Sequence, residues 1–156
     1  MTKGHWLRCL QVSKARLRKK GYLKGVIVDI AYDHLLLKNW HKYASIDKPN
    51  FIQEFYACAQ VEVVNYPQNA QEFVHRLISS KLLTSYTTLS GLHAALIRID
   101  RRLSNRILAK ETASSYFADL EREIDAMEED FLQFFPQLIE HFKCNSGLEE
   151  RDHWLL

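Results

Sequence analysis

Hydrophobic residues recur every three or four positions along almost the whole chain, which is the spacing of amphipathic α-helices. Strand signals are scarce, because the 156 residues include only five glycines and three prolines and no Asn-Gly or Asp-Gly turn. The pattern predicts an all-α fold, a single-domain helical bundle of about six helices. The expected helices cover about 7–19, 23–43, 49–65, 67–83, 89–106 and 112–142, with a polar tail from about 145.

Local signals sharpen three of these helices. The segment 23–43 is apolar around most of its circumference, so we expect it to be the central helix. Asp47 supplies a capping carboxylate and Pro49 stands in the first turn, which marks the start of the third helix. Pro136 is expected to bend or restart the last helix.

Composition limits the classes of protein. A chain of 156 residues with 47% hydrophobic content can bury one sizeable core, so 1–156 is expected to be one domain. A formal charge of +2 does not favour a dedicated nucleic-acid binder. No run reaches the roughly 18 apolar residues of a membrane span, so no membrane association is expected. Three widely spaced cysteines indicate neither a disulfide framework nor a zinc site and favour a reducing cytoplasm.

Three ionisable residues interrupt the apolar helix predicted over 23–43: Asp29, Asp33 and His34. On a helix, the two aspartates stand one turn apart on one face, and His34 lies about 100 degrees further round. Two carboxylates and an imidazole could hold Mn²⁺ or Mg²⁺ and activate a water on it. In the structural alternative, both aspartates bind arginines of neighbouring helices and His34 completes a hydrogen-bond network. Spacing alone leaves both interpretations open.

Positive charges gather in two segments. The first holds six lysines and arginines, Lys14, Arg16, Arg18, Lys19, Lys20 and Lys24. This run would attract an acidic protein or a phosphate, or it is the solvated face of a helix. Aromatic residues that could stack on bases do not interleave it, which argues against nucleic acid. In the second segment, Arg98, Arg101 and Arg102 either pair with the aspartates or clamp a substrate phosphate.

Three matches together carry a family resemblance. The first is Ser13-Lys-Ala-Arg-Leu with Gly25 and Val28-Asp29-Ile-Ala-Tyr32-Asp33-His34-Leu-Leu. The second is Leu83-Thr-Ser-Tyr86 with Gly91-Leu-His-Ala-Ala-Leu and Arg101-Arg102-Leu, and the third is the stretch from Glu121 to Phe134-Phe135-Pro136. Through them the chain resembles, over about residues 5–142, the acyl carrier protein phosphodiesterases. These bacterial hydrolases remove the 4′-phosphopantetheine arm from holo acyl carrier protein and are regarded as divergent, metal-dependent relatives of the HD phosphohydrolases.

The resemblance implies an HD-phosphohydrolase-like helical fold and a metal-dependent phosphodiesterase. It implies that Asp29, Asp33 and His34 hold Mn²⁺ or Mg²⁺, with Asp33 and His34 as catalytic residues. The expected substrate-binding residues are Lys14, Arg16 and Arg18 for the acidic acyl carrier protein, and Arg101 and Arg102 for the phosphate. No oligomeric state is indicated.

One part of the family pattern is missing from the sequence. Family members normally begin with a further segment that carries a Gly-Asp motif and a His-Arg-x-Ile-Asp motif, and only His5 resembles its final histidine. The alternative expectation is therefore a shortened, non-catalytic paralogue that binds the acidic carrier protein through its basic face.

Overall fold

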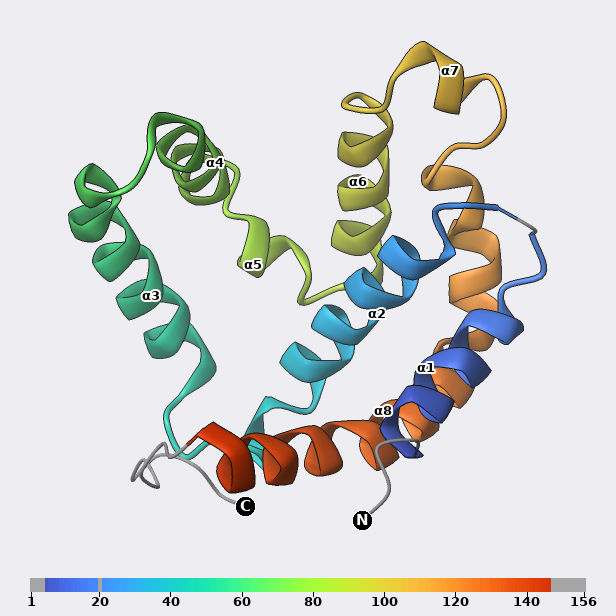
Figure 1. Ribbon diagram of the computed structural model, residues 1–156, viewed down its shortest axis with the longest axis horizontal. Coiled ribbons are helices and arrows are strands. Elements are labelled where there is room, and N and C mark those ends of the chain that lie inside the picture. The colour runs from blue at the N-terminus through green and yellow to red at the C-terminus, as the bar shows by residue number, and fades with distance from the viewer. Residues whose placement is uncertain (1–4, 20, 147–156) are drawn as a thin grey trace.

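The computed structural model describes residues 5–19 and 21–146, and all regular structure in these ranges is helical (Figure 1). Its α-helices are α1 (His5–Arg16), α2 (Lys24–Lys38), α3 (Lys48–Glu62), α4 (Gln68–Ser79), α5 (Leu82–Ser85), α6 (Leu89–Asp100), α7 (Asn105–Leu108) and α8 (Phe117–Ser146). Three 3-10 turns are η1 (Trp40–Lys42), η2 (Val63–Asn65) and η3 (Ser114–Tyr116). The predicted all-α fold is confirmed.

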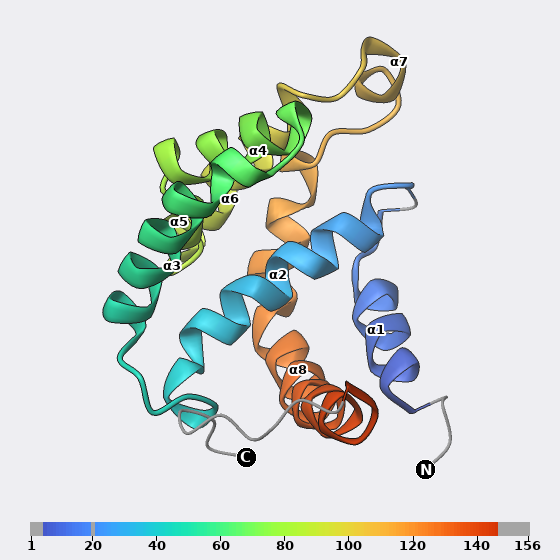
Figure 2. The same cartoon turned by 60° about the vertical axis from the view of Figure 1, so that its left-hand side comes forward.

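Helix α2 is the centre of the fold, as its sequence predicted. It packs against α1, α6 and α8 (Figures 1 and 2), and Ile27, Val28 and Leu35 are fully buried in it. Tyr116 of η3 and the stripe Leu120, Met127 and Phe131 on α8 fill the other side of the same core. The hydrophobic effect on these side chains therefore fixes the position of α2, on which the candidate site residues stand.

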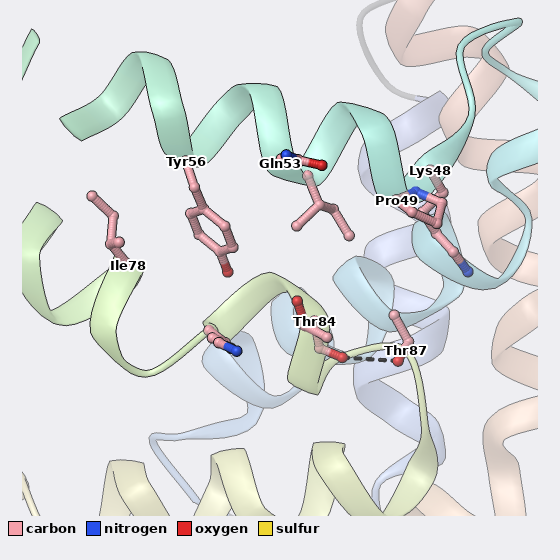
Figure 3. A pocket seen from close by; sticks show the side chains of 9 residues that line it. Lys48, Pro49, Gln53, Tyr56, Ile78, Thr84 and Thr87 are labelled. Carbon is pink, nitrogen blue, oxygen red and sulfur yellow. Dashed lines mark hydrogen bonds between the residues drawn. The ribbon is translucent and has the colours of Figure 1, made fainter. Parts of the chain in front are cut away.

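The hairpin of α3 and α4 is attached more loosely. Ile52 is the buried residue of α3, and α4 has none. Among its contacts with the rest of the chain, the Trp40 and Phe51 rings lie 4.5 Å apart, and the Tyr56 hydroxyl accepts a 2.9 Å hydrogen bond from the Leu83 amide. Lys48 at the start of α3 also donates to the Leu37 carbonyl at 3.0 Å. An open groove remains between α3, α4 and α5 (Figure 3).

Several predicted boundaries need correction. The helix expected over 67–83 is broken because Lys81 adopts a left-handed backbone, with φ of 47°, before α5 begins. The helix expected over 89–106 ends at Asp100, and α7 is a separate short helix. The first helix ends at Arg16 rather than at 19. Helix α8 extends to Ser146, past the predicted start of the tail at about 145. Lys20 and the rest of the predicted tail, from 147 onward, lie outside the described residues.

The predicted starts of α3 and α6 are confirmed, and so is the bend of the last helix. Asp47 caps α3, accepting from the Asn50 amide, and Thr88 caps α6, accepting from the Gly91 amide. Helix α8 continues through Pro136 without a restart, but its red end runs in another direction from its orange beginning in Figures 1 and 2. Proline lacks the amide hydrogen that would bond to the Leu132 carbonyl, which allows the bend.

A carboxylate from a distant segment caps the start of α2. Glu111 accepts hydrogen bonds from the Tyr22 amide at 2.7 Å and the Leu23 amide at 3.4 Å, and from the Tyr116 hydroxyl at 2.9 Å. A Cβ atom at Gly21 would overlap the Glu111 carboxylate and the Tyr116 hydroxyl as they stand, so this close approach favours glycine. Negative charge at a helix N-terminus is favourable, and the contact fixes where α2 begins.

Candidate functional site

Tyr32, Asp33 and His34 are consecutive on α2, and their side chains point in different directions. Tyr32 is buried and its hydroxyl lies 2.9 Å from the Ser13 hydroxyl, on the α1 side. His34 is only 5% exposed and faces the junction of α5 and α6. Asp33 and Asp29 are both exposed, one helical turn apart. The two carboxylates therefore form a pair on the open face of α2.

The hydrogen bond of His34 fixes its tautomer. The Nδ1 atom lies 2.7 Å from the backbone oxygen of Tyr86, and a carbonyl oxygen can only accept. Nδ1 therefore carries the proton, and Nε2 of the neutral ring has a lone pair that can accept a proton or bind a cation. This is the arrangement in which a histidine is useful as a base or as a ligand.

Asp33 has an unusual electrostatic environment for an aspartate that water can reach. Surrounding protein removes part of its hydration, and the Asp29 carboxylate adds repulsion, so that the pKa of Asp33 is raised to about 6. Within the described residues, neither Asp29 nor Asp33 makes an ion pair with an arginine. The structural alternative, in which arginines neutralise both carboxylates, is therefore not what the described part of the chain shows.

Arg98 of α6 and Arg102 just after it lie near this site, and neither forms an ion pair with Asp29 or Asp33 among the described residues. Burial and the charge of Asp33 raise the pKa of the Tyr86 phenol, while the charges of Arg98 and Arg102 lower it, which brings these groups into one neighbourhood. Arg98 donates to the Ser85 hydroxyl at 2.8 Å, and its buried Nε atom has no partner among the described residues. Arg101 and Arg102 follow α6 and are exposed.

Sequence reasoning placed Tyr86 in a family motif but gave it no role. Its carbonyl orients His34, and its ring is 7% exposed beside Asp33. A signal was present, since Tyr86 stands in the Thr-Ser-Tyr-Thr-Thr segment that precedes the capped start of α6. Its position against α2 depends on packing that the sequence does not display.

The described residues contain no group of three or more histidine, cysteine, aspartate or glutamate side chains that could hold a metal ion. A pair of carboxylates still suits Mg²⁺ or Mn²⁺, because such ions often use one or two carboxylates together with substrate phosphate oxygens and water. Asp29 and Asp33 fit that requirement, since both are exposed and unpaired within the described ranges. Their role as metal ligands, and that of His34, stays a prediction.

The side chains of the basic segment differ in burial and in their partners. Arg16 donates from Nε to the Asp130 carboxylate at 2.8 Å, which raises the pKa of the guanidinium and commits it to α8. Arg18 and Lys19 have exposed side chains, and their backbone amides donate to the Asp119 carboxylate. Lys14 is half-buried, with Nζ 3.6 Å from where a Cβ would stand on Gly25. Of the three predicted docking residues, Arg18 is the most accessible.

The raised pKa of Asp33 predicts how stability depends on pH in the metal-free protein. The pKa is about 6 in the folded chain and near 3.8 in the unfolded chain, so the folded state holds the proton more tightly between these values. The contribution of Asp33 to stability therefore falls as pH rises from about 4 to 6 and stays low above 6. Asp33→Asn is expected to stabilise the chain at pH 7 and to have little effect near pH 4.

Urea unfolding of the two proteins at both pH values measures this effect. The difference in unfolding free energy should be positive at pH 7 and should shrink toward zero near pH 4. An equal difference at both pH values would show that Asp33 has an ordinary pKa.

Comparison with known proteins relates this chain to one family. The family model described as acyl carrier protein phosphodiesterase matches residues 7–138. The acyl carrier protein phosphodiesterase of Escherichia coli O6:H1 is 26% identical over 120 residues, covering 74% of this chain and 58% of that relative. The chain thus spans less than two thirds of the relative's length.

No solved structure matches the chain, so its likeness to the HD phosphohydrolase fold stays a prediction. Among the described residues, no helix combines the length and the hydropathy needed to cross a membrane. The family match extends over most of the sequence and includes the carboxylates of α2, Tyr86 and both exposed arginines after α6. On that evidence, the chain belongs to the acyl carrier protein phosphodiesterase family.

Proposed function

We propose that this chain carries the hydrolytic site of a metal-dependent phosphodiesterase that removes the 4′-phosphopantetheine arm from holo acyl carrier protein. The observation that carries the proposal is the Asp29 and Asp33 pair, exposed on α2 without a neutralising arginine in the described residues. Leaving two carboxylates in this state costs stability, so a function is the simplest reason for it.

Each side chain of the site has a defined task in this reaction. Asp29 and Asp33 are the groups that would hold Mn²⁺ or Mg²⁺, which supplies a Lewis acid to polarise the phosphodiester. His34, whose Nδ1 is held by the Tyr86 carbonyl, would accept a proton from the attacking water at Nε2. Arg101 and Arg102 are exposed, the charge of Arg102 acts on Tyr86, and both would stabilise the negative charge on the phosphate oxygens.

Docking of the carrier protein would use the basic segment. Acyl carrier protein is acidic, and complementary charge mainly raises the rate of encounter. Arg18 and Lys19 are exposed at the turn between α1 and α2, whereas Arg16 is bound to Asp130. We therefore assign docking to Lys14, Arg18 and Lys19 and assign Arg16 mainly to the fold.

Incubation of the chain with holo acyl carrier protein and Mn²⁺ tests the function directly. The carrier protein is expected to lose the mass of its 4′-phosphopantetheine arm, as seen by mass spectrometry, and addition of a chelator should stop the loss. Apo carrier protein, which has no arm, is the matched control. Binding of the carrier protein without any loss of mass would contradict the enzyme and favour a non-catalytic binding module.

A further inference from the structure

The backbone oxygen that orients His34 belongs to the segment that leads from α5 into α6 (Figure 1). Tyr86 directly follows α5, and its oxygen lies 2.7 Å from His34 Nδ1. Because this hydrogen bond selects the tautomer of the ring, a shift of the Tyr86 backbone would change which ring nitrogen keeps its lone pair. The residues that fix the Tyr86 backbone can therefore control His34 without contacting it.

Ser85, the last residue of α5, is bound to α6 by both its side chain and its backbone. Its hydroxyl donates to the Leu82 carbonyl at 2.6 Å and accepts from an Nη atom of Arg98 at 2.8 Å. Its carbonyl lies so close to α6 that a Cβ atom on Gly91 would overlap it. The residue before Tyr86 is therefore held in position from the side of α6.

Gly91 and Arg98 stand on one face of α6. Seven positions separate them, which is close to two full helical turns. One level of this face is therefore small enough for a backbone to approach, and the next provides a charged donor. Both levels meet the same residue, Ser85.

The side chain of Arg98 is directed at Ser85 rather than at a carboxylate. Among the described residues, Arg98 makes no ion pair. Its buried Nε atom also has no hydrogen-bond partner in the described part of the chain. An unpaired buried donor costs free energy, so a placement that is kept at this cost needs an explanation. The hydrogen bond to the segment that orients His34 provides one.

We propose that Arg98 is a positioning residue for His34. Through Ser85 it holds the Tyr86 backbone oxygen in place, and this oxygen keeps the ring proton on Nδ1. The use of Nε2 in hydrolysis rests on the proposed function, whereas the positioning of the ring does not. Arg98 thus has a task distinct from that of the exposed arginines after α6, which would bind the phosphate.

The tautomer of His34 in the metal-free full chain tests the proposal. Two-dimensional ¹H–¹⁵N spectra of the imidazole rings, recorded at alkaline pH where such rings are neutral, distinguish a proton on Nδ1 from one on Nε2. The His34 signals are those that disappear in His34→Gln. In Arg98→Met, the ratio of the Nδ1–H form to the Nε2–H form is expected to fall at least about tenfold, since a charged hydrogen bond is lost.

A second variant removes the acceptor of the same hydrogen bond and does not depend on the folding of the arginine variant. Ser85→Ala is expected to lower the tautomer ratio as Arg98→Met does, and the double variant should add little to either. Arg106→Met, which replaces an exposed arginine of α7, is the matched control and should leave the ratio unchanged. An unchanged ratio in Ser85→Ala would overturn the proposal, and so would an equal fall in Arg106→Met.

The kinetics of arm release separate positioning from substrate binding. Arg98→Met is expected to lower kcat and to leave KM for holo acyl carrier protein nearly unchanged, because the lost interaction acts on His34 rather than on the substrate. A rise of KM at constant kcat would place Arg98 in substrate binding and overturn the proposal.

Failure of this inference can be told apart from failure of the proposed function. A change of the His34 tautomer in Ser85→Ala, in a chain that releases no arm, would support the positioning and refute the hydrolysis. Arm release by a chain whose His34 tautomer is the same in the parent and in Ser85→Ala would refute the positioning alone.

Discussion

Replacement of Asp33 by asparagine is expected to lower the release of the pantetheine arm at least about 100-fold, a loss typical for groups that act on the transition state. The substitution keeps the size of the side chain and removes the charge that would hold a divalent cation. The same variant should be more stable than the parent at pH 7, because the charged carboxyl is unfavourable in the folded chain. Initial rates of mass loss from holo carrier protein measure the first effect.

The combination of lower activity and higher stability identifies a functional residue. Asp125→Asn is the matched control, since Asp125 is an exposed aspartate on α8, away from the carboxylate pair of α2. It should change neither the rate nor the stability appreciably. Full activity of Asp33→Asn would show that Asp33 does not belong to the site.

Replacement of Asp130 by asparagine is expected to destabilise the fold by about 2–4 kcal/mol, because it breaks a largely buried network. One carboxylate oxygen of Asp130 accepts from the Ser13 hydroxyl at 2.8 Å and from Arg16 Nε at 2.8 Å, and the other accepts from Arg16 at 3.2 Å. Since the Ser13 proton is used in this way, the Tyr32 hydroxyl donates to Ser13. The chain of bonds joins α1, α2 and α8, and an amide nitrogen cannot accept in it.

Chemical denaturation measures this loss, and an exposed ion pair provides its control. Glu72 and Arg76 are 60% and 55% exposed and 3.8 Å apart on α4, so Glu72→Gln should cost less than about 1 kcal/mol. A comparable cost for both variants would mean that the Asp130 network contributes no more than a surface pair. Tyr32→Phe should show an intermediate loss, because it removes one hydrogen bond and keeps the ring packing against Phe131.

Local signals in the sequence were sufficient for the helical architecture. The repeat of apolar residues predicted an all-α chain, and the apolar residues around most of 23–43 predicted the central helix, because a helix that packs against several neighbours needs apolar residues on several faces. Asp47 gave the start of α3, since its side chain bonds to the amide of Asn50, only three residues away. Signals of this kind can be found without knowledge of the fold.

Boundaries set by unusual backbone geometry could not be found in this way. Lys81 adopts a left-handed conformation that is more usual for glycine or asparagine. Because a lysine stands there, the local sequence gave no signal for the break before α5. The sequence also gave no sign of the cap on α2, because Glu111 lies 89 residues from Tyr22, whose amide donates a hydrogen bond to it.

The sequence by itself determined that two aspartates stand one turn apart on a central helix with a histidine beside them, because helical geometry relates near neighbours. Only the tertiary structure decided that Tyr86 orients His34, that no arginine of the described residues pairs with the aspartates, and that Arg16 is held by Asp130. These relations join residues 52 and 114 positions apart, and such distances are set by the packing of the core rather than by local spacing.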